Sequence, residues 1–290
     1  MTRNIKYLVI TPVRDEEKYV DATIQAVVSQ SIVPQEWVIV DDGSSDKTPE
    51  ILERYAGLYS WITVVRRANR GARKSGGGVI EAFYDGYSAV RDNDWEFIVK
   101  LDGDLTFASD YFAKCFEHFD HDRSLGVGGG EIYHDCAGVA TLEVNPQFHV
   151  RGATKIYRRA CWEAIGGLLR APGWDTVDEV KANMLGWKTY SFRELKLLHH
   201  RVTGTADGAL RDRAKHGLAC YISGYHPLFL AISCVKRLVQ KPYIAGSIAI
   251  CYGFLKGYWT QTPRVDDKRL IKYLRTQQLR RLWGMDTIWR

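Results

Sequence analysis

The sequence predicts an α/β protein, with a mostly parallel sheet flanked by helices and a helical region appended at its C-terminal end. Short apolar runs rich in β-branched and aromatic residues alternate with helical segments through the first hundred residues, a pattern typical of a parallel sheet with helices on both faces. From Gly217 onward, apolar and basic helical segments follow without a further strand signal. We therefore divide the chain into an α/β domain, residues 1–205, and a helical region, residues 206–290.

The elements are predicted from apolar periodicity and from glycine and cap signals. Strands are predicted at residues 6–10, 37–40, 61–65, 97–101, 126–132 and 188–192. Helices are predicted at residues 19–28, 48–55, 79–90, 111–119, 157–165 and 176–185. Gly166 and Gly186 are expected to end the last two of these helices. The helical region holds apolar runs at 228–232 and 243–255 and a basic helix at 268–281.

Composition limits the classes of partner and compartment. A net charge of +6 fits an anionic substrate or an anionic membrane surface, and it is too small to indicate nucleic acid. The six cysteines are scattered without a C-x-x-C pair, which argues against a zinc site or a disulfide framework. With no charged-then-apolar leader, we expect a cytoplasmic protein with reduced thiols, located either in solution or at the cytoplasmic face of the membrane.

Acidic residues follow three of the predicted strands. They are Asp15-Glu16-Glu17, Asp41-Asp42 and Asp102-Gly103-Asp104. One such group is as compatible with a polar turn as with a metal site. Three on one edge of a parallel sheet describe a polar crevice, where ligands of such sheets bind. Paired carboxylates repel unless a cation lies between them, so Mg²⁺ or Mn²⁺ is expected, bound together with substrate phosphates.

Four motifs in order resemble glycosyltransferase family 2. They are Thr11-Pro12-Val13-Arg14-Asp15-Glu16-Glu17, Val40-Asp41-Asp42-Gly43-Ser44-Ser45-Asp46, Asn69-Arg70-Gly71-Ala72-Arg73-Lys74 and Leu101-Asp102-Gly103-Asp104. They cover roughly the first third of the chain. The resemblance implies a GT-A fold, a nucleotide-diphosphate sugar donor, with UDP-sugars favoured, and an inverting transfer that uses Mg²⁺ or Mn²⁺. The Gln-x-x-Arg-Trp motif of processive synthases is absent, so a non-processive enzyme of the hexosyltransferase type is expected.

The resemblance also implies roles for individual residues. The nucleotide would be held by Thr11, Pro12, Arg14, Glu16, Asp41, Asp42, Arg73 and Asp102. Among them, Asp41 would bind the base with support from Asp42, and Asp102 would face both the ribose and the metal. Asp104 would be the direct metal ligand on the diphosphate.

An inverting transfer needs a carboxylate base that takes the proton from the acceptor hydroxyl. The family carries this base in a Glu-Asp pair that opens a helix ending in Gly-aromatic, here Gly186-Trp187. Counting back aligns Asp175 with the aspartate of the pair, and Trp174 replaces the glutamate. Asp178, one turn further along the helix, is the second candidate. The alternative is that Asp175 only caps the helix.

His199-His200-Arg201 follows the last predicted strand. In GT-A enzymes a histidine at this place often completes the metal shell, so His199 and His200 are both candidate ligands, although a histidine there can also be a core residue. Arg201 is a candidate for binding the diphosphate.

The apolar runs of the helical region, flanked by Lys236, Arg237, Lys241 and Lys256, suit helices that lie in a membrane interface. The alternative is a helical subdomain packed on the sheet, or a surface that forms a homo-oligomer. The expected acceptor is a saccharide or a lipid-linked molecule used in polysaccharide or glycolipid biosynthesis. Two other functions remain open, a sugar nucleotidyltransferase and a nucleotide-sugar-binding protein without catalysis.

Overall fold

The computed structural model describes residues 5–69, 71, 77–136, 139–201, 208–239 and 242–289. The strands are β1 (Tyr7–Val13), β2 (Glu36–Asp41), β3 (Ile62–Arg66), β4 (Phe97–Leu101), β5 (Leu105–Phe107), β6 (Leu125–Cys136), β7 (Val139–Leu142), β8 (Thr154–Arg158) and β9 (Lys188–His199). The helices of the α/β domain are α1 (Val20–Val28), α2 (Thr48–Leu58), α3 (Gly77–Ser88), α4 (Tyr111–His121), α5 (Arg159–Ile165) and α6 (Trp174–Met184). Those of the C-terminal region are α7 (Ala209–Ile222), α8 (Pro227–Lys236), the 3₁₀ turn η1 (Arg237–Val239), α9 (Tyr243–Trp259) and α10 (Lys268–Leu282).

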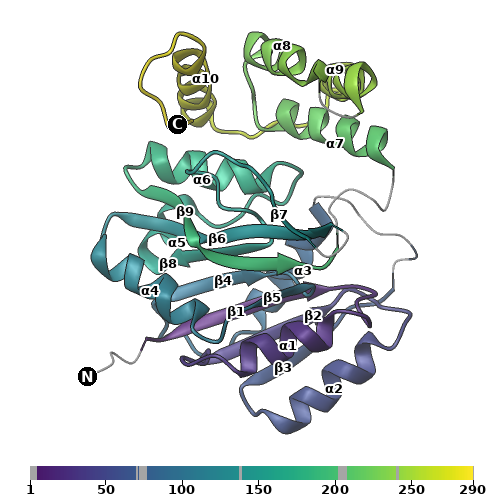
Figure 1. The fold of residues 1–290 in the computed structure, drawn as a ribbon, viewed down its shortest axis with the longest axis vertical. Coiled ribbons are helices and arrows are strands. Elements are labelled where there is room, and N and C mark those ends of the chain that lie inside the picture. The colour runs from purple at the N-terminus through teal and green to yellow at the C-terminus, as the bar shows by residue number, and fades with distance from the viewer. Residues whose placement is uncertain are drawn as a thin grey trace.

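The strands form one mixed sheet in the order β3-β2-β1-β4-β8-β6-β9-β5, with β7 paired to β6 (Figure 1). The first four predicted strands are confirmed, and they make the parallel half of the sheet, in which Val9 lies opposite both Trp37 and Val99. All residues of β1, β2 and β4 are buried. Strands covered on both faces are expected to read as continuous apolar runs, which is why they were predictable.

Alternate residues of β1 enter two different cores. Tyr7 and Val9 pack with residues of α1, α2 and α4 on one face of the sheet. Leu8 and Ile10 pack with residues of α3, α5 and α6 on the other. The period of two along a strand therefore builds both layers from one segment.

The second half of the sheet differs from the prediction. Residues 157 and 158, predicted as the start of a helix, end β8 instead, which runs antiparallel between β4 and β6. The helix begins at Arg159. The strand was hidden because Lys155, in its middle, is fully buried, and a lysine in a short run is ordinarily a sign of the surface. The strand predicted at 188–192 is present and continues to His199.

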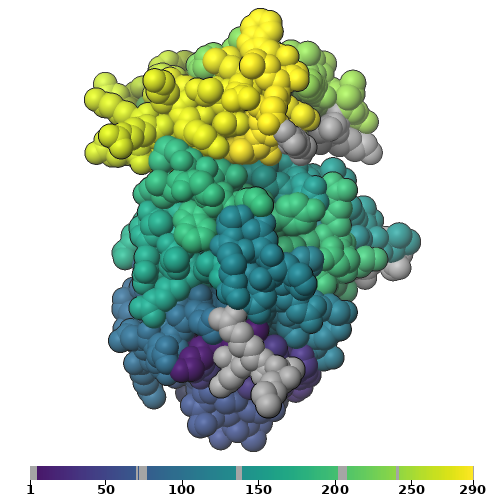
Figure 2. Space-filling model, turned by 90° about the vertical axis from the view of Figure 1, so that its left-hand side faces the viewer, coloured from purple at the N-terminus to yellow at the C-terminus, as the bar shows by residue number. Residues whose placement is uncertain are grey.

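The C-terminal helices form a separate layer across one end of the sheet (Figures 1 and 2). Two apolar clusters join them to the α/β domain: Leu169 and Ala171 pack beside α7–α9, and Leu270 of α10 packs on Val177 of α6. Helices α7 and α9 cross at backbone contact, because a Cβ at Gly253 would lie 1.9 Å from the carbonyl oxygen of Ala214. Within the described residues, none of the helices has both the length and the apolar character needed to cross a bilayer.

Candidate active site

The loops after β1 and β2 are joined to each other by their own acidic side chains. The Asp15 carboxylate accepts a hydrogen bond from the Ser45 N–H at 2.8 Å, and the Asp15 N–H donates to Ser44 Oγ at 2.9 Å. The Glu17 carboxylate accepts from the Lys47 N–H at 3.1 Å. Asp15 has a φ of 52°, a left-handed conformation that is costly for most residues and that aspartate tolerates. Asp15 and Glu17 therefore shape the crevice.

The residues predicted to hold the nucleotide lie around these loops. Thr11 Oγ1 accepts a hydrogen bond from Trp37 Nε1 at 2.9 Å, and Asp41 Oδ1 accepts one from the Ser44 N–H at 2.8 Å. Asp42 forms an ion pair with Arg67. Arg14 donates to Asn69 Oδ1 at 3.1 Å. Pro12 lies in β1 opposite Val40. Arg73, also predicted, lies outside the described residues.

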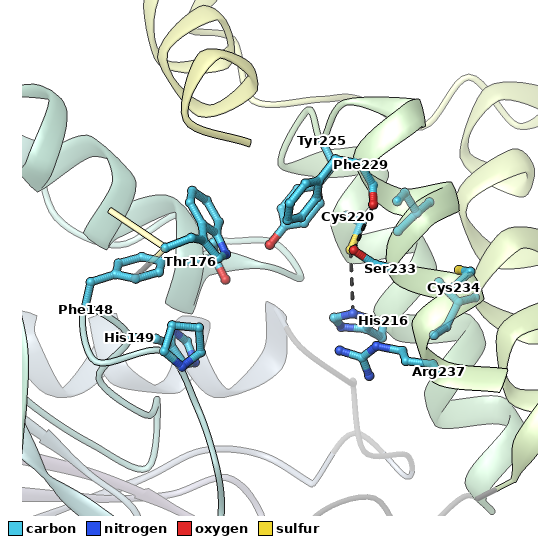
Figure 3. Close-up of a pocket in the computed structure, with 14 residues that line it drawn as sticks. Phe148, His149, Thr176, His216, Cys220, Tyr225, Phe229, Ser233, Cys234 and Arg237 are labelled. Carbon is cyan, nitrogen blue, oxygen red and sulfur yellow. Dashed lines mark hydrogen bonds between the residues drawn. The ribbon is translucent and has the colours of Figure 1, made fainter. Parts of the chain in front are cut away.

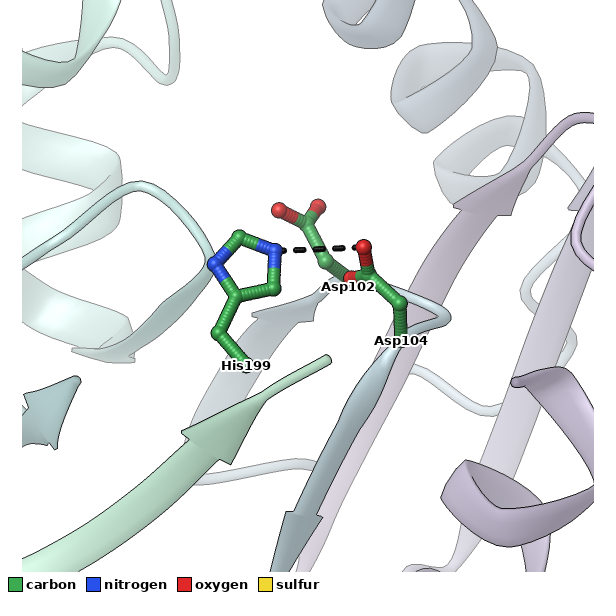
Figure 4. A group of neighbouring side chains, drawn as sticks. All are labelled: Asp102, Asp104 and His199. Atoms are coloured by element: carbon green, nitrogen blue, oxygen red, sulfur yellow. Dashed lines mark hydrogen bonds and ion pairs between the residues drawn. The ribbon is translucent and has the colours of Figure 1, made fainter. Parts of the chain in front are cut away.

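Asp102, Asp104 and His199 meet at the ends of β4 and β9 (Figure 4). One ligand atom from each lies within 4.8 Å of the others, and His199 Nε2 is 3.1 Å from Asp104 Oδ2. Two features of the sheet bring them together. Asp102 and Asp104 flank the turn between β4 and β5, and the antiparallel pairing of β5 with β9 sets Leu105 opposite His199. Asp104 and His199 are both buried.

Electrostatics support a cation-binding role for this group. Burial works to lower the pKa of His199, but the hydrogen bond to Asp104 and the charges of Asp104 and Asp102 raise it above its ordinary value. The imidazole thus experiences a strongly negative field. Lys100 pairs with one oxygen of Asp102, which leaves the other oxygen for a second partner. His199 Nδ1 is buried and has no hydrogen-bond partner among the described residues. Two carboxylates and one imidazole are donors suited to a divalent ion such as Mn²⁺ or Mg²⁺.

His200 and Arg201 point elsewhere. His200 Nε2 is hydrogen-bonded to Thr106 Oγ1 at 3.0 Å, and its ring stacks on Tyr19 at 5.7 Å between centroids. Arg201 Nη2 donates to Glu16 Oε2 at 2.6 Å and to the Asp15 carbonyl at 3.2 Å. The structure therefore brings His199, and not His200, to the two aspartates, and it sets Arg201 at the loop that follows β1.

Asp175 is partly buried in the first turn of α6. The N-cap of this helix is Gly173, which has a φ of 89°, so the alternative that Asp175 caps the helix is wrong. Burial works to raise the pKa of Asp175, but the charges of His149, Lys155 and Arg151 outweigh it and lower the pKa below its ordinary value. The side chain is therefore a carboxylate at neutral pH.

Two links connect Asp175 with the metal-ligand group. The charge of Arg151 contributes to the lowered pKa of Asp175 and partly opposes the rise in the pKa of His199. The second link runs through Trp174, whose ring lies 5.4 Å from both Lys100 Nζ and Lys155 Nζ. Since Lys100 is paired with Asp102, the Trp174 ring contacts a cation that is bound to the metal-ligand group.

Asp178, the second candidate base, is turned to the interior. Its side chain is fully buried and is bonded to Lys155 Nζ at 2.9 Å and to the Tyr157 hydroxyl. Burial raises its pKa to about 6 although Lys155 opposes the shift. A carboxylate enclosed in this way cannot reach an acceptor hydroxyl. The buried position of Asp178 therefore argues against its predicted role as a base.

Lys155, Glu179 and His149 are important residues that sequence patterns missed. Lys155 Nζ lies 2.8 Å from Glu179 Oε1 and donates to the Asp175 carbonyl at 2.6 Å, while His149 Nδ1 lies 2.8 Å from Glu179 Oε2. This network fixes the first turns of α6 against β8. Its one signal in the sequence is the acidic pair Asp178-Glu179 on an otherwise buried helix face, which requires a buried cation from elsewhere in the chain.

Comparison with known proteins identifies the family. The model described as "Glycosyl transferase family 2" matches residues 8–162, just over half of the chain. The chain belongs to glycosyltransferase family 2. Among curated relatives, the putative glycosyltransferase EpsH of Bacillus subtilis is 28% identical over 165 residues, covering 53% of this chain and 47% of the relative. The poly-beta-1,6-N-acetyl-D-glucosamine synthase of Staphylococcus aureus is 28% identical over 117 residues, which cover 40% of this chain and 26% of the relative.

Solved structures of this fold superpose over most of the family 2 chain. The mannosyltransferase PcManGT from Pyrobaculum calidifontis, in complex with GDP-Man and Mn²⁺, has a TM-score of 0.58 at 15% identity and covers 98% of this chain and 89% of its own. TarS 1-349 of S. aureus in complex with UDP-GlcNAc has a TM-score of 0.54 at 18% identity, and the match covers 90% of this chain and 74% of TarS 1-349. They confirm the predicted GT-A fold. The chain spans less than half the length of the first curated relatives that it matches.

Proposed function

We propose that this family 2 glycosyltransferase moves a sugar from a nucleotide-diphosphate donor to an acceptor hydroxyl with inversion and with the help of a divalent metal. The observation that carries the proposal is the arrangement of two acidic groups. One has ligand atoms suited to a divalent cation, and the other is a carboxylate that can accept a proton. Asp102, Asp104 and His199 meet at one point, and Asp175 lies beyond Trp174 and Arg151 as an ionised carboxylate.

Each centre has one task in the transfer. A divalent ion held by Asp104, Asp102 and His199 would neutralise charge on the leaving diphosphate. Asp175 would take the proton from the acceptor hydroxyl. The acceptor oxygen bonds to the anomeric carbon, the bond from that carbon to the diphosphate oxygen breaks, and the electron pair leaves with the diphosphate. Thr11, Pro12, Arg14, Glu16, Asp41, Asp42 and Arg73 are proposed to hold the nucleotide, and Arg201 the diphosphate.

The proposal is tested by thermal-shift measurements with UDP-, GDP- and dTDP-sugars, each with and without Mn²⁺. Binding to the folded state alone stabilises it by about 2.7 kcal/mol at a hundredfold excess over Kd. We expect one nucleotide, with UDP favoured, to raise the melting temperature clearly more with Mn²⁺ than without it. The proposal fails if no nucleotide-sugar stabilises the chain under either condition. UDP-GlcNAc and GDP-Man, the donors bound to TarS and PcManGT, are natural members of the panel.

The acceptor is proposed to be a saccharide or a lipid-linked molecule, and contact with a membrane is proposed through the outer face of α8 and α9. This face, which we call the α8–α9 face, consists of exposed apolar side chains: Leu228, Val235, Leu238, Val239, Ile244, Ile248, Tyr252, Leu255 and Trp259. Exposed apolar patches of this kind mark interaction surfaces. Lys236 and Lys256 flank the face, and cations beside an apolar helix face favour anionic lipid.

Replacing Ile248, which is 63% exposed, with glutamate is expected to weaken flotation with anionic liposomes at least tenfold. The substitution removes apolar area and adds a charge that repels the surface, which costs about 1 kcal/mol for the charge alone. Leu58→Glu, at a residue 67% exposed on α2, is the matched control and should float like the unmodified chain. Equal flotation of both variants, or no flotation of the unmodified chain, would contradict the membrane contact.

A further inference from the structure

A cavity of about 300 Å³ lies between the α/β domain and the C-terminal helices (Figure 3). Phe148 and Thr176 line it from the side of the α/β domain, and Tyr225, Phe229 and Leu230 line it from the opposite side. Trp289 closes it near the C-terminal end, with its ring 4.8 Å from that of Phe148. A volume of this size suits one ring or one short aliphatic segment.

Arg237 is a positively charged side chain in the lining of the cavity, to which Thr176, Tyr225 and Ser233 add hydroxyl groups. Figure 3 shows Arg237 beside His216, across the cavity from His149. The Arg237 guanidinium has no hydrogen-bond or ion-pair partner within the part of the chain that the structure describes, and Arg213 lines the small pocket next to it. The apolar surroundings lower the pKa of His216 to about 4, and the charges of Arg237 and Arg213 act in the same direction. His216 is therefore neutral at pH 7, and the arginines supply the charge.

The guanidinium of Arg237, at the end of an apolar cavity, is suited to bind an anion. Arg237 is partly buried, and a ligand that fills the cavity would remove its guanidinium further from water, which costs free energy unless an anion or hydrogen-bond acceptors meet it. The planar guanidinium is well matched to phosphate or carboxylate oxygens. A neutral saccharide would instead need several hydrogen-bonding groups along the walls, where aromatic and aliphatic side chains predominate.

The cavity lies next to the proposed base. Thr176, which follows Asp175 in α6, is one of its walls, and so is His149, whose charge lowers the pKa of Asp175. The charge of Asp175 in turn acts on His216, Cys220 and Tyr225, which all line the cavity. The cavity therefore lies one residue along α6 from Asp175, because Thr176 is part of its lining.

We propose that the cavity binds the apolar body of an amphiphilic acceptor and that Arg237 binds the anionic group that this acceptor carries, a phosphate or a carboxylate. The role as an acceptor site rests on the transferase function proposed above, whereas the class of ligand rests on the cavity alone. Among the acceptors considered, the cavity favours the lipid-linked one.

The test is a calorimetric titration of the full chain, without donor, with three probes below their micellar concentrations. Octyl phosphate has both features, octyl glucoside has only the apolar chain, and inorganic phosphate has only the charge. We expect saturable binding of one octyl phosphate per chain, with the two other probes at least tenfold weaker. Equal binding of octyl glucoside and octyl phosphate would overturn the proposal, and so would the absence of octyl phosphate binding.

Matched pairs of variants localise the binding. Arg237→Gln should weaken octyl phosphate binding about 10- to 100-fold, as expected when a hydrogen bond to a charged group is lost, while Lys236→Gln, at the exposed neighbouring residue, should change it less than twofold. Ser233→Phe, which fills the cavity, should abolish binding, and Ala231→Phe, on the exposed side of α8, should not. Binding that survives both Arg237→Gln and Ser233→Phe would place the ligand elsewhere and overturn the proposal.

Failure of the cavity and failure of the transferase function give different results. If octyl phosphate binds as predicted but no nucleotide-sugar is turned over, the cavity binds an anionic amphiphile as proposed, and the proposed transferase function is wrong. If sugar is transferred, Arg237→Gln should raise KM for an anionic lipid acceptor at least tenfold and leave KM for the donor unchanged. An unchanged acceptor KM would overturn the acceptor role of the cavity.

Discussion

Asp104→Ala is expected to lower metal-dependent sugar transfer about a thousandfold. Asp104 is buried, and its carboxylate contacts His199 at the point where Asp102 also converges. Removing it would take away one of the two carboxylates proposed to hold the metal, which would contribute several kcal/mol to the stabilisation of the leaving group, and about 1.36 kcal/mol corresponds to a tenfold change in rate. The measurement is initial-rate transfer across a range of Mn²⁺ concentrations.

The same variant should lose the additional thermal stabilisation that Mn²⁺ gives to the donor complex. Asp110→Ala is the matched control, because Asp110 pairs with Lys114 at the surface and exposed pairs of this kind contribute at most about 1 kcal/mol. Undiminished Mn²⁺-dependent transfer by Asp104→Ala would show that the metal site has been assigned to the wrong residues.

Asp175→Asn is expected to stop transfer and to spare donor binding. The amide keeps the shape of the side chain but cannot accept a proton, so the loss should equal the contribution of a general base, about 10²- to 10⁴-fold. Because the pKa of Asp175 is lowered by His149, Lys155 and Arg151, the carboxylate is ionised throughout the neutral range. Protonation of Asp175 can therefore reduce the rate only below about pH 4, its ordinary range.

Thermal shifts with the donor and Mn²⁺ should be the same for Asp175→Asn and the unmodified chain, which separates lost chemistry from lost folding. Asp212→Asn, on α7 at a partly exposed residue, is the control and should transfer normally. If Asp175→Asn also transfers normally, another group takes the proton, and the assignment of the base has to be abandoned.

The fold class, the parallel half of the sheet and the edge at which the acidic residues gather could all be predicted from the amino-acid sequence. This was possible because β1, β2 and β4 are buried on both faces and so read as apolar runs, and because parallel strands end at a common edge. The positions of Asp41, Asp42, Asp102 and Asp104 follow from where their strands end.

The different surroundings of His199 and His200, and of Asp175 and Asp178, depend on contacts between segments far apart in the sequence. His199 is the last residue of β9 and lies opposite Leu105 of β5, whereas His200 lies beyond the strand and is hydrogen-bonded to Thr106. Asp178 and Glu179 lie in the interior because Lys155 meets them across β8, a contact between residues that the chain order does not bring together. The cavity near Arg237 likewise depends on how α7–α9 pack against α6. Local patterns specify which residues enter an element, whereas long-range packing specifies which of them face one another.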